Sequence, residues 1–219
     1  MLFIEYLWRN PEFYLSWIVL ITFSICMHEA AHAWTAAWRG DLTAQWTGHL
    51  SLNPLKVMGT TSLIMLVLCG IAWGAVPVDR RALRTRGNWF LVSAAGLVAN
   101  LCLALVFAVL TVLLIKDAGR VIPADVAHLA TGVTVLGLKA NLFLFLFNLL
   151  PVPMLDGWEV FATIFPPMDA WRARMSNVGL LILLLLFLSP AGAYLWVAVD
   201  RLSDLVLALL AVAWRALGG

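Results

Sequence analysis

The chain has 219 residues, of which 63% are hydrophobic and only 12% are charged. Soluble domains carry about 25% charged residues, so this composition excludes an ordinary soluble enzyme and predicts an all-α polytopic membrane protein. The formal net charge is +2, and no basic run carries interleaved aromatic residues, so there is no reason to expect a nucleic-acid partner.

The first long apolar run extends from Trp17 to Trp38 and contains the polar residues His28, Glu29 and His32. About 20 helical residues cross the hydrocarbon core of a bilayer, so this run is long enough to span it. A charge near mid-membrane costs about 2.5–3.5 kcal/mol, which makes ionisable residues in such a run candidates for function.

These three residues form the pattern H-E-x-x-H. On a helix, positions i and i+4 share a face, so both imidazoles can bind one metal ion while Glu29 lies beside it. A catalytic zinc keeps one position open for water, and a neighbouring carboxylate can take the proton of that water. A chance match would leave Glu29 unpaired among apolar residues. We therefore interpret the run as part of an intramembrane zinc hydrolase.

Two segments of different character follow. Gly40 to Leu55 is rich in Thr, Trp, Gly and Pro with weak apolar alternation, so we expect a short strand or hairpin there. Val57 to Val78 is apolar enough for a transmembrane helix, but glycine and proline interrupt it. We predict that this second segment enters the membrane and returns on the same side, or lies along the interface. The interruptions are Gly59, Gly70, Gly74 and Pro77.

The basic residues support a returning segment, because Lys and Arg concentrate on the cytosolic side of membrane proteins. If Val57 to Val78 does not cross, most basic residues lie together on the cytosolic side, with Lys139 near the outer edge. The cytosolic group is then Arg39, Lys56, Arg80, Arg81, Arg84, Arg86, Arg172 and Arg174. The outer group is Arg9, Lys116 and Arg120.

The rest of the chain contains further apolar runs. Trp89 to Ile115 is a clear span, another span ends at Leu150, and Val178 to Leu188 with Tyr194 to Trp214 form a last pair. Residues 158–176 are mixed in composition, as is typical of an interfacial segment. We thus expect about five to six hydrophobic segments in one domain, residues 1–219, with a catalytic core at about 14–160 and a C-terminal helical pair at about 176–216.

Two histidines do not complete a zinc site, so a third ligand must come from elsewhere. The remaining histidines, His49 and His128, lie in or beside predicted loops, where solvated side chains are usual. Asp156 instead lies in a Pro- and Gly-rich break at the end of an apolar span, and broken backbone at membrane depth is tolerated where it lines a polar cavity. Asp156 is therefore the first candidate, and Glu159 is the second.

The motifs resemble those of the site-2 protease family of intramembrane metalloproteases. The resemblance rests on HEAAH at 28–32 and on N-x-x-P-x-x-x-L-D-G at 148–157. The stretch SLNPLK at 51–56, and SAAG followed by Asn100, resemble the shorter bacterial members. The chain has Ala95-Gly96-Leu97 where members of the family commonly carry Ala-Gly-Pro.

The resemblance implies roles for five residues. His28, His32 and Asp156 would bind one zinc ion per chain, Glu29 would be the general base, and Asn148 would help to hold the scissile carbonyl or its oxyanion. An interhelical hydrogen bond is the alternative role for Asn148.

The resemblance also implies a reaction, which is hydrolysis of a peptide bond in or near a transmembrane segment of a membrane protein. The expected setting is a prokaryotic cell membrane, with the active site toward the cytosol. The substrate helix must unwind first, and Gly40 to Leu55 could pair with it as a strand. The expected partners are a transmembrane protein substrate, the lipid bilayer and a membrane protein that regulates cleavage. The loop Lys116 to Asp125 is too short for a PDZ domain and no tail follows Gly219 for a CBS domain, so we expect a minimal member.

Two other classes of function stay open at this stage. A non-catalytic relative could bind membrane proteins, although it would have less reason to keep Glu29 beside both histidines. A metal transporter could use intramembrane His and Asp, but it should carry further polar residues on several spans. Such residues are scattered here and lie mostly near the span ends; they are Thr60, Thr61, Asn100, Lys139 and Asn141.

Overall fold

The computed structural model describes residues 2–117 and 122–216, apart from the side chain of residue 117 and several side chains between residues 172 and 191. Within these ranges the regular structure is helical throughout, which confirms the predicted all-α class. The elements are η1 (Phe3–Glu5), α1 (Tyr6–Arg9), α2 (Pro11–Trp38), α3 (Thr43–Trp46), α4 (Pro54–Val57), α5 (Gly59–Cys69), α6 (Arg86–Asp117), α7 (Ala124–Leu149), α8 (Asp156–Ile164), α9 (Pro167–Leu188) and α10 (Ala191–Ala216).

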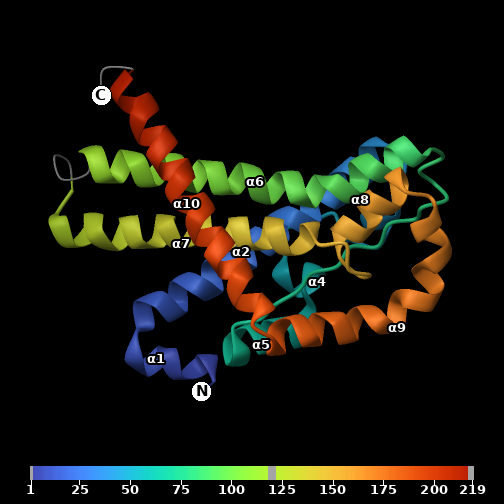
Figure 1. Cartoon of the computed structure of the whole chain (residues 1–219), viewed down its shortest axis with the longest axis horizontal. Coiled ribbons are helices and arrows are strands. Elements are labelled where there is room, and N and C mark those ends of the chain that lie inside the picture. The colour runs from blue at the N-terminus through green and yellow to red at the C-terminus, as the bar shows by residue number, and fades with distance from the viewer. Residues whose placement is uncertain (1, 118–121, 217–219) are drawn as a thin grey trace.

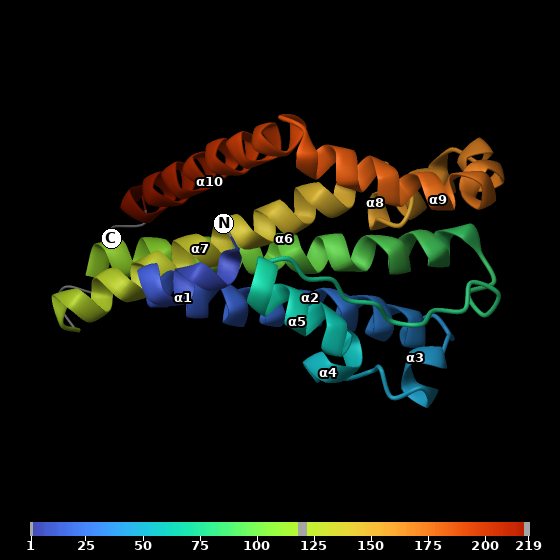
Figure 2. The same ribbon diagram turned by 90° about the horizontal axis from the view of Figure 1, so that it is seen from below.

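Helices α2, α6 and α7 are long and apolar enough to cross a membrane, with mean hydropathies of 1.4, 2.8 and 1.7. Figure 1 shows α6 and α7 side by side along most of their length, and α2 packs against both. Figure 2 shows α2 and α5 on one side of this pair and α9 and α10 on the other. Of the five to six hydrophobic segments expected, the described residues contain three helices long and apolar enough to span a membrane and the shorter apolar helix α5.

The limits of α2 follow from local chemistry. Asn10 caps its N-terminus by accepting a hydrogen bond from the Phe13 amide, and Pro11 occupies the first helical position, where its missing N–H is not needed. The helix ends at Trp38, and Gly40 follows with a φ of 100°, a conformation that glycine adopts without strain. Both histidines of the HExxH pattern therefore lie within one uninterrupted helix.

Two apolar clusters hold the helices together. One joins α2 to α4, α5 and α7 through Ile21, Ile25, Val57, Leu66 and Ala140. The other joins α6, α7 and α10 through side chains that include Ala104, Leu138 and Val199. The small residues let the helix backbones approach closely, which is the usual basis of helix packing in membranes.

The segment Val57 to Val78 folds back on itself. Helix α5 has 11 residues, or about 16 Å at 1.5 Å per residue, roughly half of the hydrocarbon thickness. Gly70 ends it with a φ of 74°, and the Ala75 amide then donates to the Val57 carbonyl at 3.0 Å. Both ends of the segment thus lie together, as the predicted return requires. The side of the membrane from which it enters stays a prediction.

The predicted strand or hairpin at Gly40 to Leu55 is wrong, because this stretch contains α3, turns and the start of α4. Side chains form local hydrogen bonds with the backbone here. Asp41 is buried and accepts hydrogen bonds from the amide and hydroxyl of Thr43, the first residue of α3. Asn53 accepts from the Leu55 amide and starts α4. Weak alternation of apolar residues cannot outweigh these local hydrogen bonds.

The C-terminal pair predicted at Val178 to Leu188 and Tyr194 to Trp214 is helical, in α9 and α10. Helix α9 begins at Pro167, earlier than expected, so it includes part of the predicted interfacial segment. Lys139 of α7 pairs with Asp200 of α10 at 2.8 Å. The side chains of Arg172 and Arg174, and the whole of Arg120, lie outside the described residues.

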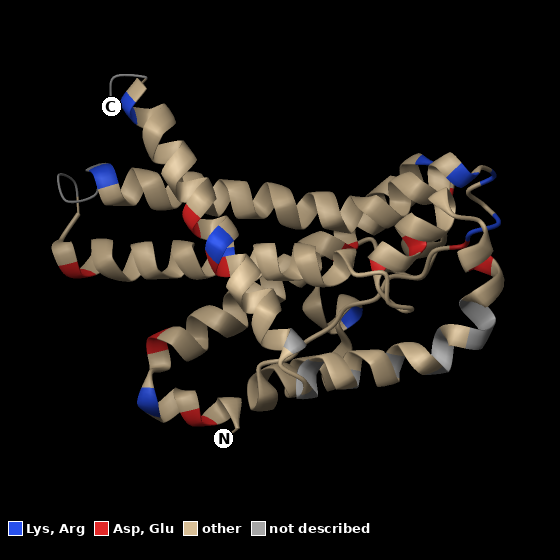
Figure 3. Ribbon diagram, viewed as in Figure 1, with Lys and Arg blue, Asp and Glu red and all other residues tan. Residues whose placement is uncertain are grey.

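Charged residues are distributed unevenly along the bundle. In Figure 3, α6 carries Lys and Arg at its ends, whereas α10 carries charged residues midway along its length, where it crosses α7. Arg39, Arg81 and Arg84 line one open pocket at the C-terminal end of α2, together with Trp38, Gly40 and Ala82. This part of the predicted cytosolic basic group is therefore gathered at one end of the molecule.

Candidate metal centre

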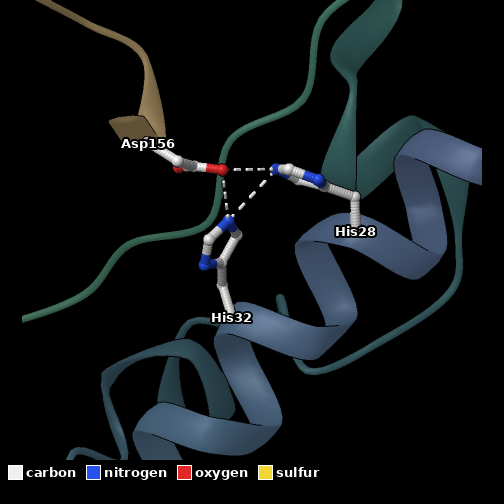
Figure 4. A group of neighbouring side chains, drawn as sticks. All are labelled: His28, His32 and Asp156. Carbon is white, nitrogen blue, oxygen red and sulfur yellow. Dashed lines mark hydrogen bonds and ion pairs between the residues drawn. The ribbon is translucent and has the colours of Figure 1, made fainter. Parts of the chain in front are cut away.

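His28 and His32 lie one turn apart on α2 and point to the same place. Their Nε2 atoms are 3.1 Å apart, and both face Oδ2 of Asp156, at 2.9 Å from His28 and 3.2 Å from His32. Figure 4 shows the three side chains converging from α2 and from the start of α8. The histidines are buried and Asp156 is half-buried. The structure thus brings together the three residues that the sequence predicted as ligands.

Asp156 reaches the histidines because the chain turns sharply after α7. Leu150 takes an extended conformation before Pro151, as residues that precede proline commonly do. Asp156 then opens α8, and Gly157 packs against the backbone at the end of α7. A Cβ on Gly157 would lie 2.5 Å from the Leu150 oxygen, so only glycine fits. The Leu-Asp-Gly sequence therefore positions the Asp156 carboxylate close to the end of α7.

Helix α6 covers the other side of the histidine pair. Gly96 lies directly against both imidazoles, and a Cβ at this position would overlap with His28 and His32. The same helix supplies two acceptors to the outer nitrogens of the rings. His32 Nδ1 lies 2.7 Å from the Val92 carbonyl oxygen, and His28 Nδ1 lies 2.6 Å from Oδ1 of Asn100. Both rings are therefore held at their Nδ1 atoms.

The cluster has the geometry and chemistry of a zinc site. A carbonyl oxygen can only accept, so His32 must carry its proton on Nδ1 and present an Nε2 lone pair to Asp156. Ligand atoms about 2.0–2.1 Å from a tetrahedral zinc lie about 3.3 Å from one another. The observed separations of 2.9–3.2 Å are close to that value. A set of two histidines and one carboxylate also leaves a fourth position for water.

Asp156 is suited to bind a cation. Its Oδ2 atom faces Nε2 of both histidines, and a carboxylate oxygen beside two imidazole nitrogens is a common set of zinc ligands.

Glu29 is buried next to the cluster but is not one of the three converging residues. The extended stretch 71–79 passes over it. A Cβ on Gly74 would lie 2.6 Å from Cγ of Glu29. Glu29 is thus held beside the metal position, as a general base in a HExxH site must be.

The other candidate residues lie elsewhere. Glu159 accepts a hydrogen bond from the indole of Trp89 at 3.0 Å and is not part of the ligand cluster. Asn148 is half-buried near the end of α7, and its amide donates to the Leu144 carbonyl of the same helix. Its predicted role in holding the scissile carbonyl stays a prediction. His49 contacts Thr47 in a loop, and His128 lies exposed on α7.

No role was predicted from the sequence for four residues that support the site, which are Gly74, Gly96, Asn100 and Asn141. The asparagines appeared to be scattered near span ends, but both are fully buried in the bundle. A polar residue within an apolar span was the available signal for them. The sequence around the two glycines did not indicate a role, because that role depends on which segments pack against α2. These segments are α6 for Gly96 and residues 71–79 for Gly74.

Comparison with known proteins agrees with this geometry. The chain is 35% identical over 206 residues to the Bacillus subtilis (strain 168) protein named "Putative zinc metalloprotease YwhC", covering 91% of this chain and 93% of the relative. The chain belongs to the site-2 protease family. Within this family it is also similar to two mycobacterial proteins that bear the same description with the name Rip2.

The Rip2 protein of Mycobacterium tuberculosis (strain H37Rv) is 33% identical over 183 residues, which is 80% of this chain and 65% of that protein. The Rip2 protein of Mycolicibacterium smegmatis is 34% identical over 177 residues, which is 77% of this chain and 64% of that protein. No protein-family model and no solved structure matches the chain. The family assignment therefore rests on these relatives, with the site geometry as an independent observation.

Proposed function

We propose that this chain is an intramembrane zinc metalloprotease that hydrolyses a peptide bond in or near a transmembrane segment of a membrane protein. One observation carries the proposal. His28 and His32 of α2 converge with Asp156, which lies at the start of α8 just after α7, among helices long and apolar enough to span a membrane, and Glu29 is buried on the same helix as the histidines. A hydrolytic metal site needs these groups, and an apolar bundle excludes them unless they have a function.

Each residue has a distinct task in this scheme. His28, His32 and Asp156 would hold a zinc ion through the three atoms that face one another. Zinc, when bound, polarises the scissile carbonyl and makes a water acidic. Glu29 takes the proton of the attacking water and passes it to the leaving amine nitrogen. Asn148, near the end of the span that precedes Asp156, steadies the carbonyl oxygen of the substrate.

The substrate must present an extended backbone, since a helix hides its carbonyl groups in its own hydrogen bonds. The sequence-predicted strand at 40–55 is not available for pairing, because it is helical and turned. The stretch 71–79 lies outside the helices, its ribbon is drawn out along α2 in Figure 2, and its Gly74 packs against Glu29. We therefore place the unwound substrate alongside 71–79, where backbone pairing would bring a peptide bond to the site.

The basic residues support a site that opens toward the cytosol of a prokaryotic cell. The pocket that contains Arg39, Arg81 and Arg84 lies at the C-terminal end of α2, the half of the helix that carries the histidines. Since basic residues face the cytosol, this end is the cytosolic one. The partners in this scheme are a transmembrane substrate, the bilayer and a membrane protein that selects the substrate.

The test measures zinc content and cleavage in the same preparation. The purified chain is reconstituted in vesicles with a single-span test protein that carries Gly and Pro within its transmembrane segment. We expect about one zinc per chain and cleavage that a chelator stops and added zinc restores. Zinc binding without cleavage would favour a non-catalytic binding protein, and zinc flux into the vesicles without cleavage would favour a transporter.

A further inference from the structure

A continuous series of contacts between buried polar side chains leads from His28 away from the metal position. We call this series of His28, Asn100, Asn141 and Ser24 the relay. His28 of α2 contacts Asn100 of α6, Asn100 contacts Asn141 of α7, and Asn141 returns to Ser24 of α2. The three contacts measure 2.6, 3.1 and 2.9 Å between heavy atoms. Ser24, Asn100 and Asn141 are each 0% exposed. The relay therefore links three neighbouring helices without contact with solvent.

One backbone group fixes the direction of the whole relay. The side-chain nitrogen of Asn141 lies 2.9 Å from the Gly137 carbonyl oxygen, which can only accept a hydrogen bond. The amide of Asn141 must therefore present its NH₂ group to Gly137 and Ser24, and its oxygen to Asn100. This oxygen also only accepts, so Asn100 must donate from its own NH₂ group.

The same reasoning reaches the histidine. Since Asn100 donates to Asn141 through its NH₂ group, it presents Oδ1 to His28 Nδ1. An amide oxygen accepts, so Nδ1 must carry the proton and Nε2 must carry the lone pair. A half-turn of the Asn100 amide would place its oxygen against that of Asn141, and both would be buried without a donor between them. The relay allows one tautomer of His28.

We propose that Asn100 and Asn141 are positioning residues that hold His28 in the Nδ1–H tautomer, with the Gly137 carbonyl as the fixed end of the relay. This inference rests on the metal site of the proposed function, but it concerns the free imidazole as well. As a consequence, both histidines have the tautomer that metal binding requires before any metal binds. His28 by this relay, and His32 by the Val92 carbonyl, both present unprotonated Nε2 atoms to Asp156.

The first test observes the tautomer directly in the metal-free protein. Nitrogen-15 NMR of labelled histidine distinguishes Nδ1–H from Nε2–H, and replacing His49 and His128 with Gln leaves only the two site histidines. We expect both to be Nδ1–H in the otherwise unchanged chain. In Asn100→Leu, His28 should shift toward Nε2–H, whereas His32 should be unchanged because Val92 still holds it. Asn141→Leu does not contact His28, yet it should also shift the His28 tautomer.

The second test measures zinc affinity by competition with a chelator. Asn100→Leu should raise the zinc dissociation constant about 10–100-fold, the usual effect of removing a hydrogen-bond partner of a ligating histidine. Asn100→Asp keeps an acceptor for His28 and should bind zinc more tightly than Asn100→Leu. Thr111→Val is the matched control, since it removes a buried hydrogen bond to Thr134 between the same two helices, away from the site.

These outcomes separate the relay from the proposed function. An unchanged His28 tautomer in Asn100→Leu would overturn the relay even if the protein binds zinc and cleaves. Equal loss of zinc affinity in Asn100→Leu, Asn100→Asp and Thr111→Val would also overturn it, because the effect would then be one of helix packing. If the unchanged chain lacks zinc but shows the expected tautomers, the relay stands and the proposed function fails.

Discussion

The orientation of single side chains decides whether the cluster can bind a metal. Three acceptor atoms, Nε2 of His28, Nε2 of His32 and Oδ2 of Asp156, face one another within 3.2 Å. With both rings protonated at Nδ1, no proton lies between these atoms, and their lone pairs repel. A cation at the centre removes this repulsion, which is why the arrangement favours a metal over a hydrogen-bonded cluster.

The third ligand can be tested by comparing two acids on the same helix. Asp156→Ala removes one of the three converging atoms and should weaken zinc binding more than about 100-fold, beyond the effect of losing an outer hydrogen bond. Glu159→Ala should stay close to the unchanged chain, since Glu159 contacts Trp89 and not the cluster. Chelator competition gives both constants. Loss of zinc in Glu159→Ala with retention in Asp156→Ala would show that the wrong acid was assigned.

Gly96 gives a second prediction at this scale. Gly96→Ala places a methyl group on top of both imidazoles, so α6 or the histidines must move. Overpacking of this kind costs about 1–3 kcal/mol. We expect at least tenfold weaker zinc binding, measured by the same competition. Gly132→Ala in α7 is the control, because nothing lies within 4 Å of a Cβ there. Equal zinc affinity in the two variants would mean that the close packing of Gly96 against the histidines is not needed for zinc binding.

At the scale of elements, the sequence predicted the features that depend on local periodicity, such as the helical face that carries both histidines. It did not predict the contacts that form only when distant segments pack together. HExxH places His28 and His32 on one helical face wherever that helix lies, and the Pro- and Gly-rich break marks Asp156 as a residue at a span end. The close contacts of Gly74 and Gly96 exist only after other segments pack onto α2. The strand expected at 40–55 is wrong, because Asn53 caps α4 and the Asp41 side chain binds Thr43 at the start of α3.

The extended stretch 71–79 yields a prediction about Glu29. In Gly74→Ala the new methyl group would lie 2.6 Å from Cγ of Glu29, so the carboxylate must shift. Displacement of a catalytic group by about 1 Å can reduce turnover about 100-fold. We expect this loss with zinc content unchanged, because the atoms nearest to the new methyl group belong to Glu29 and Ile25. Turnover equal to that of the unchanged chain would mean that the position of Glu29 does not limit the reaction.

At the scale of the whole molecule, the predicted return of Val57 to Val78 would place the site near one face of the membrane. Helix α5 has 11 residues, fewer than a helical span needs, and the pocket at the end of α2 contains basic residues that precede and follow this segment. Histidines in the C-terminal half of α2 and an aspartate after the end of α7 can then meet near one membrane face. A crossing between Val57 and Val78 would separate them by much of the bilayer thickness.

Cysteine labelling tests this topology. Single cysteines at positions 45 and 84 are introduced into a chain in which Cys26, Cys69 and Cys102 are replaced, and a membrane-impermeant thiol reagent is added to intact or inverted vesicles. Both positions are exposed in the structure. We expect both to react from the same, cytosolic face. Reaction from opposite faces would mean that Val57 to Val78 spans the membrane.

The most direct test of the central claim is the cleavage rate of Glu29→Gln with zinc bound. Gln has nearly the same shape as Glu but cannot take the proton of the attacking water, and Glu29 is not among the three converging ligands. We expect about one zinc per chain in this variant and a fall in cleavage of the single-span test protein of at least about 100–10,000-fold. Cleavage at the rate of the unchanged chain, with zinc bound, would contradict the assignment of Glu29 as the base and the proposed mechanism.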